Sequence, residues 1–510
     1  MNIFSEINNR KKKLDLMISQ GFNFPNNFIP KNKTYFLCKK YNNFDKLILE
    51  KKKINVSIAG RIFTKRIFGK AIFALISDFS GSFLNGKIQI YINYNILGKI
   101  GFNNFKNYDL GDIIGVCGIL FKTNTNELTI KVNKILFINK SIHQISSKFY
   151  GLSNKEIKYR KRYLDLIINP KVRLVFKIRS SIISFIRKFL EKNDFLEVET
   201  PMFHKIPGGA SAKPFITYHN SLNMKMFLRV SPELFLKKLI VGGFNRIFEI
   251  NRNFRNEGLS IFHNPEFTML EFYSTYVDYK WLMIFIEKIF KKLTFFLYKK
   301  NIIKYREKKI DFSKPFKRFT IIDAILNYTN YTIFQLNNIS FLYLELKKIS
   351  LKLNKKIIKN LDMDLYQMQL ILFDITTKSK IINPTYIIDY PVSVSPLARL
   401  SNINKNITER FELFIYGCEI ANGFSELNDS KEQSKRFLKQ IIKHKNINIK
   451  NIKKKTFKNN KYYDKDYINA LEYGMPPTAG CGIGIDRLVM ILTNSFSIKD
   501  VILFPYLRNI

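Results

Sequence analysis

Residues 226–273 read MFLRVSPELFLKKLIVGGFNRIFEINRNFRNEGLSIFHNPEFTMLEFY, and this stretch decides the fold of the larger part of the chain. Its pattern predicts a helix, a turn at Gly242 and Gly243, and then two antiparallel strands joined by a loop. Side chains two positions apart point to the same face of a strand, so Arg255 and Glu257 are expected to share one face of the first strand.

The returning strand carries three side chains of equal parity, Phe267, Glu271 and Tyr273. A purely structural hairpin would turn apolar residues toward the core and leave scattered polar residues outside. A face built of arginine, carboxylates and aromatic rings therefore favours a ligand site on this sheet over a structural surface.

A second group of polar residues lies in FELFIYGCEIANGFSELND, residues 411–429. Glu412 and Glu419 flank a predicted bend at IYG, so a chain that folds back there brings two carboxylates together. Such a pair can bind Mg²⁺ jointly with triphosphate oxygens. Three further residues alternate on one face of the second strand: Asn422, Phe424 and Glu426.

The third group is AGCGIGIDRLVMILT, residues 479–493, a glycine-rich strand that leads into a helix with Arg487 in its first turn. Glycines allow close backbone approach, and an arginine at this position can contact a phosphate or stack on a base. The spacing matches neither a Walker phosphate loop nor the dinucleotide-binding GxGxxG turn. If the site binds a nucleotide, another architecture must hold its phosphates.

Short alternating apolar runs between residues 54 and 138 predict about five strands separated by Gly, Asn and Asp turns. This pattern favours a small closed barrel of the OB type, an architecture that binds single-stranded nucleic acid. The basic, polar and aromatic residues expected on or beside these strands are Arg61, Lys65, Arg66, Phe73 and Gln89. Taken alone, Phe73 fits the interior of a barrel better than a base-stacking surface.

The chain is expected to be an α+β protein of several parts. These are a basic, helical lead-in at residues 1–53, the barrel at 54–140, a linker at 141–165, and a larger domain at 166–510 that contains a mainly helical insertion at about 295–388. A basic, low-complexity run at residues 444–463 is interpreted as a solvated loop or helix face in preference to a nucleic-acid contact.

Lys and Arg number 85 against 40 Asp and Glu, which gives a formal net charge of +45. Such a charge attracts polyanions, and nucleic acid is the natural partner. Lys, Asn, Ile, Phe and Tyr are enriched together, however, as codon bias in an AT-rich genome would produce. The charge alone is therefore weak support for a nucleic-acid partner.

The four cysteines are far apart in the sequence: Cys38, Cys117, Cys418 and Cys481. Their spacing indicates neither a zinc site nor a disulfide framework, and it fits a reducing cytoplasm. The first residues contain no apolar signal segment, and the chain has no apolar run of the roughly 18 residues that a membrane span requires. We therefore expect neither export nor membrane insertion.

Together with FLEVETP, residues 195–201, these segments resemble the signature motifs of class II aminoacyl-tRNA synthetases. FRNEGLSIFHNPEFTMLEFY and EIANGFSELND are similar to the bacterial lysine-specific branch of the aspartyl, asparaginyl and lysyl subclass. The resemblance implies an antiparallel sheet flanked by helices, activation of L-lysine with ATP and Mg²⁺, and its transfer to tRNA(Lys). It also implies a homodimer built by the motif that includes Asn193 and Pro201.

The same resemblance implies residue roles. ATP would be bound by Arg255, Glu257, His263, Asn264, Phe267 and Arg487, of which Arg255 and Arg487 would be catalytic. Lysine would be enclosed by Gly209, Glu233, Glu271, Tyr273, Asn422, Phe424 and Glu426, and Mg²⁺ would be bound by Glu412 and Glu419. The anticodon would be contacted by Arg61, Arg66, Phe73, Gln89 and Glu127.

Two alternative functions stay open. A related enzyme that attaches lysine to a protein in place of tRNA would be expected to lack the barrel. A non-catalytic RNA-binding descendant would need none of the predicted catalytic, metal and lysine residues, which include Arg255, Glu412, Glu419, Glu426 and Arg487. Their joint presence argues against that alternative. Because a buried ammonium must be paired, Glu271 and Glu426 also favour lysine over an anionic amino acid.

Overall fold

The computed structural model describes residues 3–81, 86–144, 155–210, 212–354, 363–445 and 463–508. The chain divides into two compact units, residues 1–174 and 175–510. Most of the basic run at 444–463 and much of the predicted linker lie outside the described residues. Among the described residues, no helix is long and apolar enough to span a membrane.

Five strands of the first unit form a closed barrel in the order β1-β2-β3-β5-β4. The strands are β1 (Asn55–Phe68), β2 (Ala71–Ser77), β3 (Lys87–Asn93), β4 (Ile113–Lys122) and β5 (Leu128–Asn139), with α4 (Tyr94–Asn107) between β3 and β4. Alternate residues such as Ile58, Ile90 and Val116 are fully buried inside the barrel. The predicted closed barrel is confirmed.

The segment before the barrel is helical and packs onto it. It forms α1 (Ile3–Ser19), α2 (Thr34–Tyr41) and α3 (Lys46–Lys52). From α1, the Arg10 guanidinium donates to the carbonyl oxygens of Leu110 (3.0 Å) and Ser141 (2.9 Å), while Leu49 of α3 is fully buried in the barrel core. Two short helices follow the barrel, α5 (Lys155–Arg160) and α6 (Arg162–Ile168), and α7 (Pro170–Glu191) comes next.

The second unit is built on an eight-stranded sheet in the order β14-β15-β16-β17-β18-β11-β10-β6. Its strands are β6 (Leu196–Glu197), β10 (Arg246–Phe254), β11 (Glu266–Thr275), β14 (Lys317–Thr320), β15 (Thr385–Ile388), β16 (Arg410–Ile415), β17 (Cys418–Ser425) and β18 (Thr478–Gly484). Only the outermost pairs, β14–β15 and β6–β10, are parallel in this described sheet. The predicted antiparallel sheet flanked by helices is confirmed.

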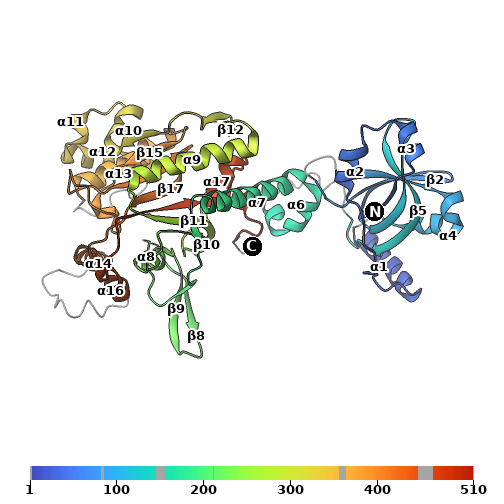
Figure 1. Cartoon of the computed structure of the whole chain (residues 1–510), viewed down its shortest axis with the longest axis horizontal. Helices are drawn as coiled ribbons and strands as arrows, with labels where there is room; N and C mark the ends of the chain where they lie inside the picture. The colour runs from blue at the N-terminus through green and yellow to red at the C-terminus, as the bar shows by residue number, and fades with distance from the viewer. Residues whose placement is uncertain are drawn as a thin grey trace. The chain divides into compact units, whose positions relative to one another are not determined.

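Helices cover the two faces of this sheet differently. On one face, α9 (Tyr279–Tyr298) lies along the strands (Figure 1), and with α7 and α17 (Ile485–Leu492) it buries Phe248 and Phe272 in the main core. Asp278 caps the N-terminus of α9, because its carboxylate accepts a hydrogen bond from the Trp281 N–H (2.9 Å). On the other face, α8 (Glu233–Val241) and α16 (Lys465–Glu472) pack against Tyr273. Phe272 and Tyr273, adjacent residues of β11, therefore pack on opposite faces of the sheet.

The segment at 295–388, predicted as a mainly helical insertion, contains both helices and strands. Its helices are α10 (Ile321–Tyr328), α11 (Ile333–Leu336), α12 (Ile339–Leu353) and α13 (Leu365–Thr376), and it also contains the hairpin β12 (Ile302–Tyr305) and β13 (Lys308–Asp311). The structure differs from the expectation, because β14, inside this segment, and β15, at its end, belong to the central sheet. The helices pack around Phe373 against Phe414 of β16.

A separate three-stranded sheet has the order β7-β9-β8, and its hairpin β8–β9 projects from the body of the unit (Figure 1). Its strands are β7 (Phe203–His204), β8 (Ile216–His219) and β9 (Met224–Leu228). The described residues of this unit also form α14 (Ser430–Lys445), α18 (Ile498–Val501) and two short 3₁₀ turns at Lys378–Lys380 and Val392–Val394.

Candidate active site

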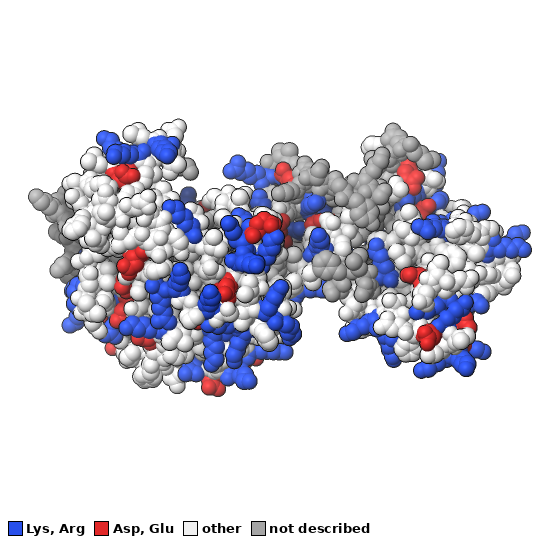
Figure 2. All heavy atoms as spheres, turned by 90° about the horizontal axis from the view of Figure 1, so that it is seen from above, with Lys and Arg blue, Asp and Glu red and all other residues white. Residues whose placement is uncertain are grey.

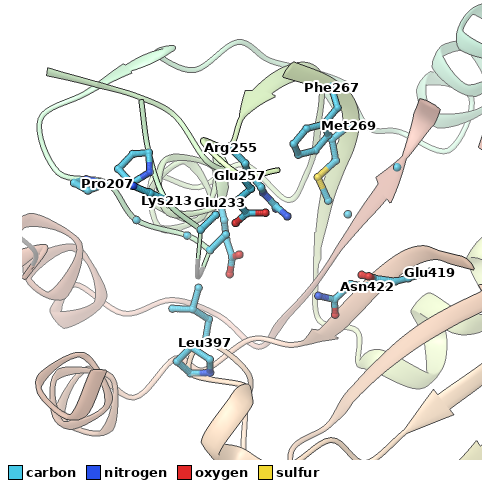
Figure 3. Close-up of a pocket in the computed structure, with 18 of the residues that line it drawn as sticks. Pro207, Lys213, Glu233, Arg255, Glu257, Phe267, Met269, Leu397, Glu419 and Asn422 are labelled. Atoms are coloured by element: carbon cyan, nitrogen blue, oxygen red, sulfur yellow. The ribbon is translucent and has the colours of Figure 1, made fainter. Parts of the chain in front are cut away.

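A cavity of about 1010 Å³ opens on the α8 side of the central sheet. Strands β11, β17 and β18, the loop after β10 and the segment around Gly209 all contribute to its wall. Figure 3 shows Glu233 and Arg255 close together on one side of this cavity and Glu419 and Asn422 across from them. The three polar groups found in the sequence therefore meet in one place.

Arg255 and Glu257 do not lie on the first strand, as the sequence pattern predicted, but in the loop directly after it. Strand β10 ends at Phe254, which pairs with Glu266. The Arg255 N–H still donates to the Pro265 carbonyl (2.8 Å), but proline has no N–H to return a bond, so the strand pairing stops there. Both side chains nevertheless line the cavity.

The Arg255 guanidinium is placed to meet an anion. Its centre lies 5.1 Å from the centroid of the Phe267 ring, and burial lowers the pKa of Arg255. Within the described part of the chain, its buried Nε has no hydrogen-bond partner. A buried cationic donor without a partner is costly unless a ligand supplies one.

On the opposite wall, Arg487 connects three segments of the cavity. Its Nη1 donates to the Glu419 carbonyl oxygen (2.9 Å), and its Nη2 lies 3.1 Å from Nε2 of His263. Burial and then the charge of Arg487 lower the pKa of His263, which favours the neutral form of the ring, the form in which a ring nitrogen can accept a hydrogen bond. Asn264 also lines the cavity and donates from Nδ2 to the Glu266 carbonyl (2.6 Å).

The bend predicted between Glu412 and Glu419 is present. Strands β16 and β17 are joined at Tyr416 and Gly417, both of which have positive φ (52° and 69°), as a tight hairpin turn requires. Burial and then repulsion from Glu419 raise the pKa of Glu412 to about 7. Glu412 accepts hydrogen bonds from Arg410 (2.6 Å) and Tyr390 (2.9 Å), whereas Glu419 lines the cavity.

This pair of carboxylates suits a hard divalent cation. Oxygen ligands are what Mg²⁺ prefers, and a cation would relieve the repulsion between the two glutamates. Among the described residues, no group of three or more His, Cys, Asp or Glu side chains is arranged to hold a metal ion. A metal at Glu412 and Glu419 would therefore need further oxygen ligands from a bound phosphate or water.

The residues predicted to enclose lysine form two layers. Gly209, Glu233, Asn422 and Phe424 line the cavity. Glu271, Tyr273 and Glu426 are buried next to it, with exposed fractions of 2–3%. The predicted parity of β11 holds here, because Phe267 lines the cavity and Glu271 and Tyr273 face the same side of the sheet.

Hydrogen bonds fix the buried carboxylate of Glu271. It accepts from the Ser231 hydroxyl (3.0 Å) and the Tyr273 hydroxyl (3.2 Å). Burial and then repulsion from Glu233 raise the pKa of Glu271 to about 8. Three carboxylates, those of Glu233, Glu271 and Glu426, thus act on one another within a small volume. Such a cluster attracts cations.

The five barrel residues are arranged less uniformly. Phe73 is only half-buried and alternates with the core residues Ile72 and Ala74, so it faces out of the barrel and is not a core residue. Its ring lies 5.0 Å from that of Tyr91, and Arg66 is its cross-strand neighbour.

The other barrel residues make contacts within the barrel or lie at its surface. Arg61 donates to the Gly111 carbonyl (2.6 Å), and Gln89 accepts from the Thr129 hydroxyl (2.8 Å). Glu127 is exposed in the loop before β5. The aromatic surface around Phe73 is therefore the part of the barrel best suited to stacking.

Sequence reasoning missed several residues that shape the site. The Asp486 carboxylate accepts from Arg179 (2.6 Å) and from the Thr268 N–H (2.7 Å), which fixes the helix of Arg487 against β11. Ser231 holds Glu271, and Lys237 lies between Glu233 and Glu426. The helical pattern of the sequence does not show whether Lys237 is exposed or buried. Only the fold reveals its contacts with Glu233 and Glu426.

Comparison with known proteins agrees with this geometry. The model of the class II tRNA synthetase family (D, K and N) matches residues 154–508, and that of the OB-fold nucleic acid binding domain matches residues 56–138. Proteins named lysine–tRNA ligase from Herminiimonas arsenicoxydans and Janthinobacterium sp. (strain Marseille) are each 51% identical over 502 residues, which cover 98% of this chain and 95% of each relative. The one from Methylobacillus flagellatus is 50% identical over 500 residues, 98% of this chain and 94% of that protein. The chain therefore belongs to the class II tRNA synthetases of the aspartyl, lysyl and asparaginyl group, with an OB-fold nucleic acid binding domain preceding the synthetase domain.

Proposed function

We propose that this chain is a lysine–tRNA ligase, which activates L-lysine with ATP to lysyl-adenylate and transfers the lysyl group to tRNA(Lys) for protein synthesis. The observation that carries the proposal is the cluster of Glu233, Glu271 and Glu426 beside Arg255 at one cavity. Full-length relatives that bear the name lysine–tRNA ligase support it. An acidic pocket fits an amino acid with two ammonium groups and disfavours an anionic one.

In this proposal, ATP binds across the outer part of the cavity. Phe267 stacks on one face of the adenine, and Arg487 covers the other face and reaches the γ-phosphate. Glu257, His263 and Asn264 contribute further contacts to ATP. The support is that all five residues line the same cavity, with Phe267 on β11 and Arg487 in the first turn of α17.

Lysine binds deeper, below the nucleotide. Gly209 and Glu233 hold its α-amino group, and Glu271, Tyr273 and Glu426 pair with the ε-ammonium. Asn422 and Phe424 form the wall between them. Gly209 suits this role because its φ of +84° is a conformation that glycine adopts without strain, and a Cβ there would press on Ser231 and Glu233.

Mg²⁺ is the proposed metal, held by Glu412 and Glu419 together with phosphate oxygens of ATP. When bound, it would neutralise phosphate charge and orient the triphosphate. The donor chemistry supports this assignment, since both ligands are carboxylates, and burial and then repulsion from Glu419 raise the pKa of Glu412.

The first chemical step needs no protein base, because the lysine carboxylate is already anionic at neutral pH. One of its oxygens forms a bond to the α-phosphorus of ATP. The bond from that phosphorus to the bridging oxygen breaks, and its electron pair leaves with pyrophosphate. In this proposal, Arg255 neutralises the charge that develops on the α-phosphate while it holds the lysine carboxylate, so its contribution is positioning and electrostatic stabilisation. The support is that Arg255 lines the cavity and that, within the described residues, its buried Nε has no partner.

In the second step, a hydroxyl oxygen at the 3′ end of the tRNA attacks the lysyl carbonyl carbon. The bond from that carbon to the phosphate oxygen breaks, AMP leaves with the electron pair, and the hydroxyl proton is released. We propose that the barrel, at residues 54–140, binds the anticodon through Phe73 with contributions from Arg61, Arg66, Gln89 and Glu127. Basic side chains outnumber acidic ones over the face shown in Figure 2, as a polyanionic partner requires.

We also propose a homodimer in the cytoplasm. Helix α7 and the segment that ends at Pro201 correspond to the dimer-forming motif of the family. Next to them, Leu196, Met202 and Phe203 are exposed, which favours burial against a second copy. The four cysteines are all free, as expected for a reducing compartment.

Exchange of radioactive pyrophosphate into ATP tests the reaction directly. The purified protein would be assayed with each of the twenty amino acids, with and without Mg²⁺, and then with tRNA. We expect exchange with lysine alone, dependence on Mg²⁺, and charging of tRNA(Lys). Exchange with aspartate or asparagine would show that the pocket is misassigned, and no exchange by folded protein would refute the enzymatic function.

Lysine binding is expected to release a proton and to strengthen as the pH rises. In the free protein the pKa of Glu271 is raised to about 8, so below that pH its carboxyl group is protonated and cannot pair with an ammonium. Binding must displace this proton, so the KM for lysine should fall by up to about tenfold per pH unit between about pH 6 and about pH 8. Calorimetry in buffers of different ionisation enthalpy measures the proton directly. A lysine affinity that is flat over this range, without proton release, would contradict the prediction.

A further inference from the structure

Lys237 is a charged residue inside the protein that has no role in the functions proposed so far. It belongs to α8 and has an exposed fraction of 0%. Its Nζ donates to Oε1 of Glu233 at 2.7 Å and forms an ion pair with Oε2 of Glu426. The ammonium also lies 5.4 Å from the centroid of the Phe424 ring. All three neighbours are residues assigned above to lysine binding.

A lysine at this position is not explained by packing. The neighbouring residues of α8 that face the same core, Leu236 and Ile240, are apolar and fully or almost fully buried. Burial alone lowers the pKa of an ammonium, but the attraction of Glu233 and Glu426 outweighs it and raises the pKa of Lys237. An apolar side chain would fill the same space without this desolvation cost. The charge of Lys237 therefore needs a reason other than stability.

The charges of the pocket supply that reason. Once lysine binding has displaced the proton of Glu271, the pocket contains three carboxylates, those of Glu233, Glu271 and Glu426. The substrate has two ammonium groups, and Arg255 is available for its carboxylate. Lys237 neutralises one of the three negative charges, which leaves two for the two ammonium groups. Without it, the substrate-bound pocket would contain one buried carboxylate in excess, and excess buried charge is costly.

Lys237 also fixes geometry, because it contacts acids that belong to different parts of the chain. Glu233 begins α8, and Glu426 directly follows β17. The hydroxyl of Tyr467, from α16, is a further group close enough to act on Lys237 and Glu426 electrostatically. A single ammonium thus ties two carboxylates that must face opposite ends of one substrate molecule.

We propose that Lys237 is a positioning and specificity residue: a built-in counter-charge that holds Glu233 and Glu426 in place and limits the pocket to a substrate with two ammonium groups. The inference rests on the proposed lysine-activating function. In this proposal, Lys237 affects substrate binding through the two glutamates and does not contact the reacting atoms.

The test replaces Lys237 with methionine, which has a similar length and no charge. In lysine-dependent pyrophosphate exchange, we expect the KM for lysine to rise roughly 100-fold, since removing one partner of a buried ion pair is strongly disruptive. The KM for ATP and kcat at saturating lysine should change by less than about threefold, because Lys237 does not contact the nucleotide. Lys238→Met is the matched control: Lys238 is the next residue, and it pairs with Asp466, whose side chain is largely exposed.

A double-mutant cycle separates this role from a general loss of structure. If Lys237 acts through Glu426, the effects of Lys237→Met and Glu426→Gln on the KM for lysine will not multiply, and the double variant will be no worse than the poorer single variant. Multiplying effects, or equal losses in the KM for lysine and for ATP, would overturn the proposal.

Two further outcomes are decisive. Lys237→Gln keeps a hydrogen-bond donor and serves if the methionine variant is insoluble; if neither variant folds while Lys238→Met does, Lys237 is a folding residue and the proposal fails. If the unaltered protein gives no lysine-dependent exchange, the proposed function fails first. Normal exchange with an unchanged KM for lysine in Lys237→Met refutes only the role of Lys237.

Discussion

Replacing Arg255 with alanine is expected to lower lysine-dependent pyrophosphate exchange by about 1000-fold or more, because the residue acts on charge that develops in the transition state. The guanidinium is held beside Phe267 (5.1 Å to the ring centroid), and within the described residues its buried Nε has no protein partner. The guanidinium is therefore already in position, and the protein does not have to rearrange when the substrate binds. The loss should appear in kcat as well as in kcat/KM.

The matched control is Arg252→Ala. Arg252 belongs to the strand that leads to Arg255, but its side chain is 44% exposed and pairs with Glu266 at 3.5 Å on the surface. Its removal should change exchange by less than about twofold, since exposed pairs contribute little. Thermal unfolding of Arg255→Ala should match that of the unaltered protein within a few degrees. Near-normal turnover by a folded Arg255→Ala protein would show that Arg255 is not the group that stabilises the α-phosphate.

The sequence could predict which side chains of β11 share a face, because alternate side chains of a strand point to the same side of the sheet. Phe267, Glu271 and Tyr273 keep one side of β11, while Phe272 between them enters the main core. The bend between Glu412 and Glu419 was predictable for a similar reason, since only a tight turn fits between two apolar runs that flank IYG. Both features follow from the pattern of neighbouring residues, so the sequence alone is enough to predict them.

Features that depend on partners elsewhere in the chain were not predictable. Arg255 and Glu257 leave the strand because Pro265, ten residues later, cannot return a hydrogen bond. The four-residue strands β14 and β15 are too short to show a period. Strand β15 joins the sheet by pairing with β16, and β14 joins it by pairing in parallel with β15 across 64 intervening residues. The proposed role of Lys237 was also not predictable, because it depends on an ion pair with Glu426, which is far away in sequence.

The second large effect is expected from Glu419→Gln, which removes one of the two proposed Mg²⁺ ligands. Glu412 is enclosed and already accepts hydrogen bonds from Arg410 and Tyr390, whereas Glu419 faces the cavity. Glu419 is therefore the ligand better placed to meet the metal and the phosphates. At a fixed ATP concentration and low Mg²⁺, exchange should fall on the order of 100-fold, because a neutral amide oxygen binds Mg²⁺ less strongly than a carboxylate.

Raising the Mg²⁺ concentration should restore part of the lost exchange, so that the half-saturating concentration of Mg²⁺ increases while the KM for lysine changes little. A readout that does not depend on turnover is the stabilisation of the protein against thermal unfolding by ATP and Mg²⁺ together, which should shrink in the variant. Glu432→Gln, on α14 and paired with Arg436, is the matched control, since it loses the same charge at a residue that does not line the cavity. If Glu419→Gln and Glu432→Gln respond to Mg²⁺ alike, the metal is bound without Glu419. The carboxylate pair must then serve to orient Arg487, whose Nη1 lies 3.5 Å from Oε2 of Glu419.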